Sequence, residues 1–386
     1  MTEKTRQLPL FLPRELFPEL FACLQKNFDR VVGPIVHQHA VVYQELESLA
    51  QLPQGFRDTT EAGQYRLYTT GSFRLFDCVS SAQGIKPWLF LPEEPLWQLS
   101  TGVDASFESI PVDALSTAWV GARACDLAGL NLLDKHFLHN GCVDERYQKR
   151  REKLFVVAVN CHRSLATCFC ASTADGPEVS AGFDLLLDEL NQGFVLVAAT
   201  DKARSAIAAL ELSPATAAQI AAADVGREQA RKQQRVMPSP HKLAELQSAN
   251  LSVEHWQEVA ERCLTCGNCT AVCPSCFCFR ATDDTPITGE QHQHGRQWDS
   301  CFSDSHSYIV GSQVHKTAEH KYRQWLLHKL SYWFGQYGRS GCSGCGRCIS
   351  WCPAGIDLVA EANRLCSDAG GDAESVRGDN GGPYDG

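Results

Sequence analysis

The chain lacks several features that would place it in common functional classes. No stretch approaches the ~18 consecutive apolar residues that a membrane-spanning helix needs. The N-terminal segment, MTEKTRQLPLFLPREL, has no signal-peptide h-region, so we expect a cytoplasmic protein. Positive charge is not in excess: the formal net charge is −10, which argues against a general nucleic-acid binder. Neither G-x-G-x-x-G nor G-x-x-x-x-G-K-[ST] occurs, so the sequence predicts no dinucleotide or P-loop site of its own.

The length of 386 residues suggests two or three domains, and we expect an α+β protein. Its first domain, residues 1–210, is expected to be α/β. Buried strands are predicted at KPWLFLPEEPLW (ending at Pro92), STAWVGARAC, KLFVVAVNC and GFVLVAAT. Helices are predicted at LFPELFACLQKNFDRVV and at DLAGLNLLDKHF, the latter with Asp126 as its N-cap.

The rest of the chain divides into a connector, a helical domain and a tail. An Ala-rich segment at residues 211–237 is expected to be a helical connector. In residues 238–366, helices are expected to bracket cysteine motifs, with Ser252 capping one of them. Another helix is expected to bury Tyr322, Leu326, Leu330 and Trp333 on one face. The Gly/Asp-rich tail, residues 367–386, is expected to be disordered.

Cysteine is the residue that the chain has in excess, with nineteen copies. Disulfides are a poor explanation, because the number is odd and a reducing compartment keeps thiols free. Clustering at fixed short spacings favours thiolates that bind metal.

Two segments share one cysteine spacing, C-x2-C-x2-C-x3-C followed by proline. In two-cluster ferredoxin folds the first three cysteines of such a motif hold one cluster, and the fourth ligates the other cluster. We therefore assign one [4Fe–4S] cluster to Cys263, Cys266, Cys269 and Cys352. The second [4Fe–4S] cluster is assigned to Cys342, Cys345, Cys348 and Cys273. Four-thiolate zinc sites are the alternative, which this spacing disfavours.

A third group of cysteines follows two of the predicted strands. Cys125 comes after STAWVGARA, and Cys161, Cys168 and Cys170 come after KLFVVAVN. If these strands are parallel neighbours, their carboxyl ends lie close together, which is the usual place for a site in an α/β domain. The four thiols could hold a third [4Fe–4S] cluster or be small buried apolar residues. Asp126 is a reserve ligand that could replace one thiolate.

Three cysteines remain near the first motif without a partner set, namely Cys276, Cys278 and Cys301. We expect Cys276 and Cys278 to be buried thiols at the domain junction. An open-iron cluster on these three residues is the alternative, although no acid/base arrangement accompanies them. The histidines of this region, including His306, are interpreted as polar loop residues.

Much of the chain resembles the beta subunit of sulfhydrogenases (cytosolic nickel–iron hydrogenases), a family that also includes the iron–sulfur subunit of anaerobic sulfite reductases. Residues that carry the resemblance are KPWLFLPEEPLW, GARACDLAGLNLLDKHF, YQKRR, NCHRSLATCFC, GPEVSAGFDLLLDEL, CLTCGNCTAVCPSCFC, WDSCF and HKLSYWFGQYGRSGCSGCGRCISWCP. The resemblance implies an α-helical ferredoxin domain with two clusters. It also implies a third cluster on Cys125, Cys161, Cys168 and Cys170. The acidic, Gly-rich tail departs from the family pattern.

The same resemblance implies an electron-transfer subunit without a substrate site or catalytic residues of its own. Its partners would be a flavin- and NAD(P)-binding diaphorase-type subunit and the small subunit of a nickel–iron hydrogenase. The alternative is the electron-transfer subunit of an anaerobic sulfite reductase, whose catalytic partner contains siroheme. A zinc-stabilised interaction protein without a redox role is a third interpretation, which the paired motif disfavours. No nucleic acid and no direct membrane span are expected.

Overall fold

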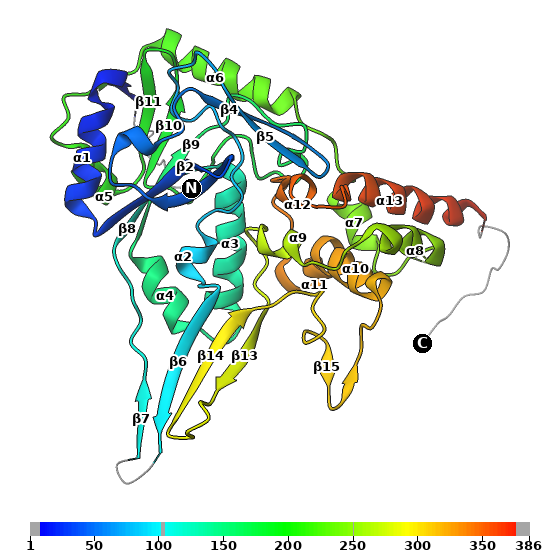
Figure 1. The fold of residues 1–386 in the computed structure, drawn as a ribbon. Coiled ribbons are helices and arrows are strands. Elements are labelled where there is room, and N and C mark those ends of the chain that lie inside the picture. Colours follow the sequence, from blue (N-terminus) through cyan, green and yellow to red (C-terminus); the bar gives the residue numbers. More distant parts are fainter. Residues whose placement is uncertain (1–7, 102–104, 250, 376–386) are drawn as a thin grey trace, which may run out of the picture.

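The computed structural model describes residues 8–101, 105–249 and 251–375. Its larger sheet has the strand order β12-β1-β11-β10-β9-β8-β2-β3 (Figure 1). The strands are β1 (Leu10–Pro13), β2 (Arg30–His37), β3 (Ala40–Glu45), β8 (Thr117–Ala122), β9 (Leu154–Val159), β10 (Leu185–Glu189), β11 (Gly193–Ala198) and β12 (Ser213–Pro214). The central pairs β2–β8, β8–β9 and β9–β10 are parallel, as expected for the two strands that precede the third cysteine group.

Side chains of the central strands alternate between two apolar cores. In β9, Phe155 and Val157 face a core that also contains residues of α1 (Phe17–Asn27) and α5 (Asp201–Ile207). Val156 and Ala158 face a second core with α3 (Ala124–His139). Because both faces are covered, these strands read as continuous apolar runs, which is why the sequence predicted them correctly.

A second sheet, with the order β13-β14-β6-β7, joins distant parts of the chain (Figure 1). Its strands are β6 (Glu93–Ser100), β7 (Ser106–Ser109), β13 (Phe279–Asp284) and β14 (Gln291–Trp298). β6 lies in the expected first domain, whereas β13 and β14 lie between the two cysteine motifs. The two expected domains therefore share a sheet.

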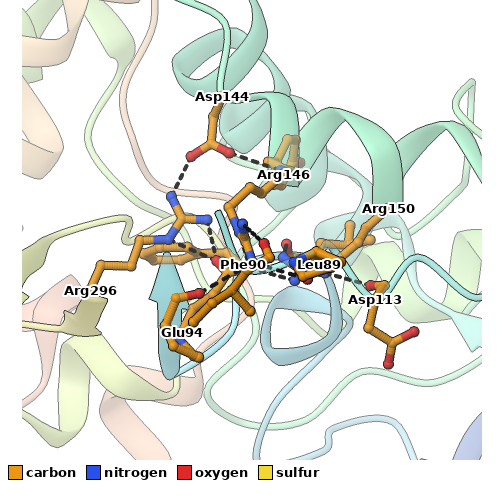
Figure 2. Close-up of polar contacts among 12 residues, drawn as sticks. Leu89, Phe90, Glu94, Asp113, Asp144, Arg146, Arg150 and Arg296 are labelled. Carbon is orange, nitrogen blue, oxygen red and sulfur yellow. Dashed lines mark hydrogen bonds and ion pairs between the residues drawn. The ribbon is translucent and has the colours of Figure 1, made fainter. Parts of the chain in front are cut away.

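A buried ion cluster fixes β14 to β6 (Figure 2). Glu94 on β6 accepts hydrogen bonds from Arg296 of β14 at 2.6 and 2.9 Å. Arg146 and Arg150, both on α4 (Glu145–Glu152), bond the other carboxylate oxygen at 2.7 and 2.5 Å. Arg296 also contacts Asp144, the N-cap residue of α4. The carboxylate thus links one helix and two strands from different halves of the chain.

Helices surround the paired cysteine motifs. They are α7 (Pro240–Glu245), α8 (Val253–Arg262), α9 (Asn268–Ala271), α10 (Ala318–Leu327), α11 (Trp333–Tyr337), α12 (Arg347–Ser350) and α13 (Leu358–Ser375), with a π-helical turn at His328–Tyr332. Ser252 caps α8 as predicted, since its side chain accepts from the His255 N–H. Tyr322, Leu326, Leu330 and Trp333 are all buried, as expected of the apolar face. The connector contains α6 (Ala217–Lys232). Two hairpins are formed by β4 (Phe56–Glu61) with β5 (Gln64–Thr69) and by β15 (Tyr308–Ile309) with β16 (Ser312–Gln313). The other short elements are α2 (Lys86–Leu89) and 3₁₀ turns at Arg14–Leu16 and Leu49–Gln51.

The structure corrects four expected elements. The strand predicted to end at Pro92 is not formed: Lys86–Leu89 form α2 with proline in the first turn, and β6 begins only at Glu93, after Pro92. The helix predicted from LFPELFACLQKNFDRVV ends at Asn27, and its β-branched end belongs to β2. The N-cap of α3 is Arg123, while Asp126 lies at N3 and accepts from the Arg123 N–H at 3.2 Å.

The fourth correction concerns the expected disordered tail. α13 continues through Ser375, so residues 367–375 are helical. Its first turns bury Leu358, Ala362 and Leu365, and this packing supports a helix that then continues along the chain. Residues 376–386 lie outside the described part of the chain. Within the described residues, no helix combines the length and apolarity that crossing a membrane would require.

Candidate iron–sulfur sites

Site 1 consists of Cys263, Cys266, Cys269 and Cys352, which line one hollow together with aromatic side chains. Burial raises the pKa of the Cys269 thiol well above its ordinary value, and the charges of the other three sulfurs raise it further. The Ile356 N–H donates to the Cys352 sulfur at 3.3 Å. The structure thus brings the fourth cysteine of the second motif to the first three of the other motif.

A tight turn presents the first three of these cysteines. α8 ends at Arg262, and Thr265 and Gly267 then adopt positive φ values of 50° and 73°. A Cβ on Gly267 would lie 3.0 Å from the Ser300 hydroxyl, so glycine serves both the turn and the close approach. The short helix α9 follows and carries Cys269.

Site 2 consists of Cys273, Cys342, Cys345 and Cys348. Burial raises the pKa of the Cys348 thiol well above its ordinary value, and the charges of Cys342, Cys345 and Cys273 add to the increase. The Gly344 N–H approaches the Cys342 sulfur at 3.4 Å. The exchange of fourth cysteines expected from the spacing is therefore reciprocal in the structure.

Site 3 consists of Cys125, Cys161, Cys168 and Cys170. Cys161 follows β9, and Cys125 lies in the first turn of α3, directly after β8. Burial raises the pKa of the Cys170 thiol well above its ordinary value, and the charges of Cys168 and Cys161 raise it further. Burial also raises the pKa of the Cys125 thiol, and the charges of Asp126 and Cys170 raise it further. The carboxyl ends of two parallel strands thus bring the third cysteine group together.

The three sites are neighbours in the order 1, 2, 3. Cys348 of site 2 also lines the hollow of site 1. The loop of the second motif packs on the loop that carries Cys168 and Cys170: the Phe169 N–H donates to the Gly344 carbonyl at 2.9 Å. A Cβ on Gly344 would lie only 2.4 Å from the Cys170 Cα. This backbone-to-backbone contact places site 2 beside site 3.

Buried cations lie beside the sulfurs. Lys329 donates to the Ser275 hydroxyl at 3.1 Å and to the Gly341 carbonyl at 3.2 Å. Burial lowers the pKa of Lys329, but the charges of Cys273, Cys276 and Cys342 outweigh burial and leave the pKa well above its ordinary value. Burial lowers the pKa of Lys86 to about 8, although Cys276 and Cys273 oppose this. Such charges compensate the negative charge of thiolates held away from water.

Asp126 forms an ion pair with Arg347 in the structure. Its Oδ1 lies 2.6 Å from Nη1 of Arg347, and both side chains are buried. Arg347 also donates to the Ser81 carbonyl at 2.8 Å. Asp126 therefore lies next to Cys125 as the partner of a buried cation, and this contact favours the thiol of Cys125 as the ligand.

Cys276, Cys278 and Cys301 do not form one set. Cys276 lies beside Cys273 of site 2. Cys278 instead lies with Cys301 and His306, and the ligand atoms of these three residues are all within 4.8 Å of one another. An open-iron cluster on Cys276, Cys278 and Cys301 does not match this arrangement.

Sequence reasoning missed the buried lysines, the arginine that faces Asp126, and His306. Lys329 contacts Ser275, which is 54 residues away, and Arg347 contacts Ser81 across 266 residues. No local spacing encodes such contacts. The WDSCF segment and the histidine that follows it were the available signal for the Cys301–His306 pair.

Comparisons with known proteins agree with the site geometry. Residues 262–356 match the family model described as a 4Fe-4S dicluster domain. The chain is 26% identical over 360 residues to sulfhydrogenase 2 subunit beta of Pyrococcus furiosus, covering 90% of this chain and 95% of that protein. Over most of its length the chain is thus similar to a sulfhydrogenase beta subunit. No solved structure matches the chain.

This relationship confirms the resemblance predicted from the sequence and extends over both halves of the fold. The dicluster match contains all eight cysteines of sites 1 and 2. Sulfur donors, burial and N–H groups directed at sulfur are what a [4Fe–4S] cluster requires, so the residues present at these sites fit such a group. Site 3 offers the same donor set, with the Gln234 amide 3.2 Å from the Cys170 sulfur.

Proposed function

We propose that this chain is an electron-transfer subunit that holds three [4Fe–4S] clusters at sites 1, 2 and 3. When bound, each cluster would accept and release one electron. The observation that carries the proposal is the succession of three four-thiol sites, each in contact with the next. Helices around sites 1 and 2 support an α-helical ferredoxin organisation, and α3 with the larger sheet supports site 3.

The fold positions these sites through close packing. α3 packs on the end of the first motif, where a Cβ on Gly129 would lie 2.6 Å from Pro274, the residue that follows Cys273 of site 2. Cys266 is exposed, so site 1 lies nearest to solvent and to a docking partner. No acid/base group is required, since electrons move without proton transfer to a substrate.

We infer that the chain connects a flavin- and NAD(P)-binding subunit to a nickel–iron hydrogenase module in the cytoplasm. The name of the Pyrococcus furiosus relative, a sulfhydrogenase subunit, supports this partner over a siroheme sulfite reductase. Purification of the native complex tests the inference. Co-purifying flavin and nickel are expected, and a siroheme subunit in their place would contradict it.

Anaerobic iron and sulfide analysis tests the cluster number. Three clusters give about twelve irons per chain and two give about eight. Cys125→Ala should lower the wild-type value toward eight, whereas the control Cys142→Ala, at an exposed position, should leave it unchanged. EPR of the reduced protein should lose one cluster signal in the first variant alone. Equal iron in both variants would remove Cys125 from site 3.

A further inference from the structure

A compact group of metal-binding side chains lies outside the three cluster sites. The ligand atoms of Cys278, Cys301 and His306 all lie within 4.8 Å of one another. Cys278 directly precedes β13, Cys301 follows β14, and His306 lies in the turn before β15. The three residues come from segments that the fold, not the local sequence, brings together.

The spacing of these atoms fits one ion. Zinc binds sulfur at about 2.3 Å and imidazole nitrogen at about 2.0–2.1 Å, so tetrahedral donors lie roughly 3.5–3.8 Å apart. The observed limit of 4.8 Å requires only a small closure to reach that distance. A cubane cluster carries its thiolates on different irons and holds them farther apart, so the group is too tight for a fourth cluster.

The surroundings also suit a metal site. Cys301 is 5% exposed, and the Cys278 sulfur lies close to both the Cys301 sulfur and the His306 ring. Nδ1 of His306 is buried, and no hydrogen-bond partner for it is found among the described residues. Asp299 accepts from the Ser300 N–H at 2.8 Å and orders the turn that carries Cys301. Such supporting hydrogen bonds hold ligand-bearing loops in place.

We propose that Cys278, Cys301 and His306 bind one Zn²⁺ ion, with water at the fourth position. Two thiolates and one imidazole are the ligand types that zinc prefers over magnesium or calcium. The ion joins the beginning of β13 to the end of β14 and to the turn after it. It thereby fastens the base of the β13–β14 hairpin beside site 1. This site is independent of the electron-transfer proposal, because it uses none of the twelve cluster cysteines.

Metal analysis of the purified full-length chain tests the proposal. Protein produced with added zinc should contain about one zinc per chain besides its iron, since one ion satisfies the three ligands. Cys278→Ser and His306→Ala should lose most of the zinc and keep the wild-type iron content. The controls Cys142→Ser and His292→Ala, at positions outside the group, should keep both metals. Wild-type protein without zinc, or zinc retained in both site variants, would overturn the proposal.

Zinc X-ray absorption of the wild-type protein provides a measurement that needs no variant to fold. Two sulfur scatterers at about 2.3 Å and nitrogen or oxygen scatterers at about 2.0–2.1 Å are expected. A shell of four sulfurs would place the zinc in a cluster site and contradict the assignment. Mass spectrometry of the alkylated protein should find Cys278 and Cys301 as thiols, and a disulfide between them would equally contradict it. Because iron content and EPR are measured separately, failure here is distinguishable from failure of the electron-transfer proposal.

Discussion

Two buried lysines set the charge around site 2. Lys329 lies beside Cys273 and Cys342, and Lys86 contacts the carbonyls of Thr270, Ala271 and Cys276 at 3.1–3.3 Å. Lys86 also lies 4.0 Å from the centre of the Trp298 ring. A fixed positive charge favours the more negative, reduced state of a nearby redox group, because the attraction grows as negative charge is added.

Lys329→Met should therefore lower the midpoint potential of the cluster at site 2. The lysine charge is expected to stabilise the reduced cluster by about 1–2 kcal/mol, and losing this stabilisation lowers the midpoint potential by roughly 40–90 mV for one electron. EPR-monitored redox titration measures the shift. Lys316→Met, at an exposed position, is the control and should leave all potentials unchanged. Equal potentials in the two variants would show that Lys329 does not act on site 2.

His136 should make stability depend on pH. It stacks on Phe277 with ring centres 3.4 Å apart, and its Nδ1 lies 2.8 Å from the Tyr337 hydroxyl. Burial lowers the pKa of His136 to about 4. The ordinary pKa of histidine is about 6.5, so below that pH His136 is protonated in the unfolded chain but stays neutral in the folded chain. The free energy of unfolding therefore falls as pH decreases from about 6.5 toward 4.

Thermal unfolding of the wild type and of His136→Gln, at about pH 7 and about pH 5.5, checks this sign. The wild type should lose more of its unfolding temperature on acidification than the variant, which has no titrating group at this position. His139→Gln, at the exposed end of α3, should behave like the wild type. If His136→Gln shows the wild-type pH dependence, His136 does not carry the effect.

Residue roles could be predicted only where local spacing encodes them. The motif spacing was sufficient to propose the cysteine sets of sites 1 and 2, because three of each four lie on one short loop, and their role as cluster ligands stays a prediction. His306 and Lys329 were not predictable in this way, because their partners are brought to them by tertiary packing. Asp126 was assigned as an N-cap from its position before an apolar run, although Arg123 is the capping residue and Asp126 pairs with Arg347.

At the scale of elements, the loop of the second motif meets the loop of site 3 at glycines, and Gly344 is the one that lies against Cys170. Gly344 has φ = 68°, and a Cβ there would collide with the backbone of Cys170. Gly338 has φ = 70°, but a Cβ there meets nothing within 4 Å. An alanine would be strained at either position because of the positive φ, but only at Gly344 would its Cβ also meet another backbone.

Gly344→Ala should consequently reduce the iron content toward about eight per chain, because it separates the loop of site 2 from the loop of site 3. Gly338→Ala has the same left-handed strain and should retain the wild-type iron content. Iron analysis and EPR of both variants measure the difference. Full iron in Gly344→Ala would mean that the close backbone contact is not needed for site 3.

The elements that the sequence predicted well are those with uniform burial. β8 and β9 are buried at every position, so their apolar runs identify them. β14 reads QHQHGRQW and has no apolar run by which the sequence could identify it. Pairing with β6 and the contacts of Arg296 hold this strand in place instead. In KPWLFLPEEPLW, the apolar residues suggested one strand, whereas the prolines divide the segment into a helix and a strand.

At the scale of the whole molecule, the ion cluster around Glu94 joins the two halves of the chain (Figure 2). Burial raises the pKa of Glu94, but hydrogen bonds from Arg150 and Arg146 outweigh burial and lower the pKa to about 2. The carboxylate is therefore ionised throughout the physiological pH range, and its removal leaves buried arginines without their partner.

Glu94→Gln should lower the free energy of unfolding by about 3–5 kcal/mol, the usual cost of breaking a buried ion pair from one side. Glu93→Gln makes the same chemical change at the neighbouring, exposed position of β6 and should change stability by less than about 0.5 kcal/mol. Anaerobic thermal or denaturant unfolding compares them. Equal stabilities of the two variants would show that the cluster contributes little to joining the halves.

The shared sheet also limits how the protein can be divided for expression. A fragment that starts near residue 238 would contain both paired motifs but would lack β6, the strand that pairs with β14 from Gln291 to Gln297. The free edge of β14 would then offer unpaired N–H and C=O groups to other copies, which promotes aggregation. Co-expression with the complementary fragment, which carries β6, β7 and α4, is the way to keep such a fragment in solution.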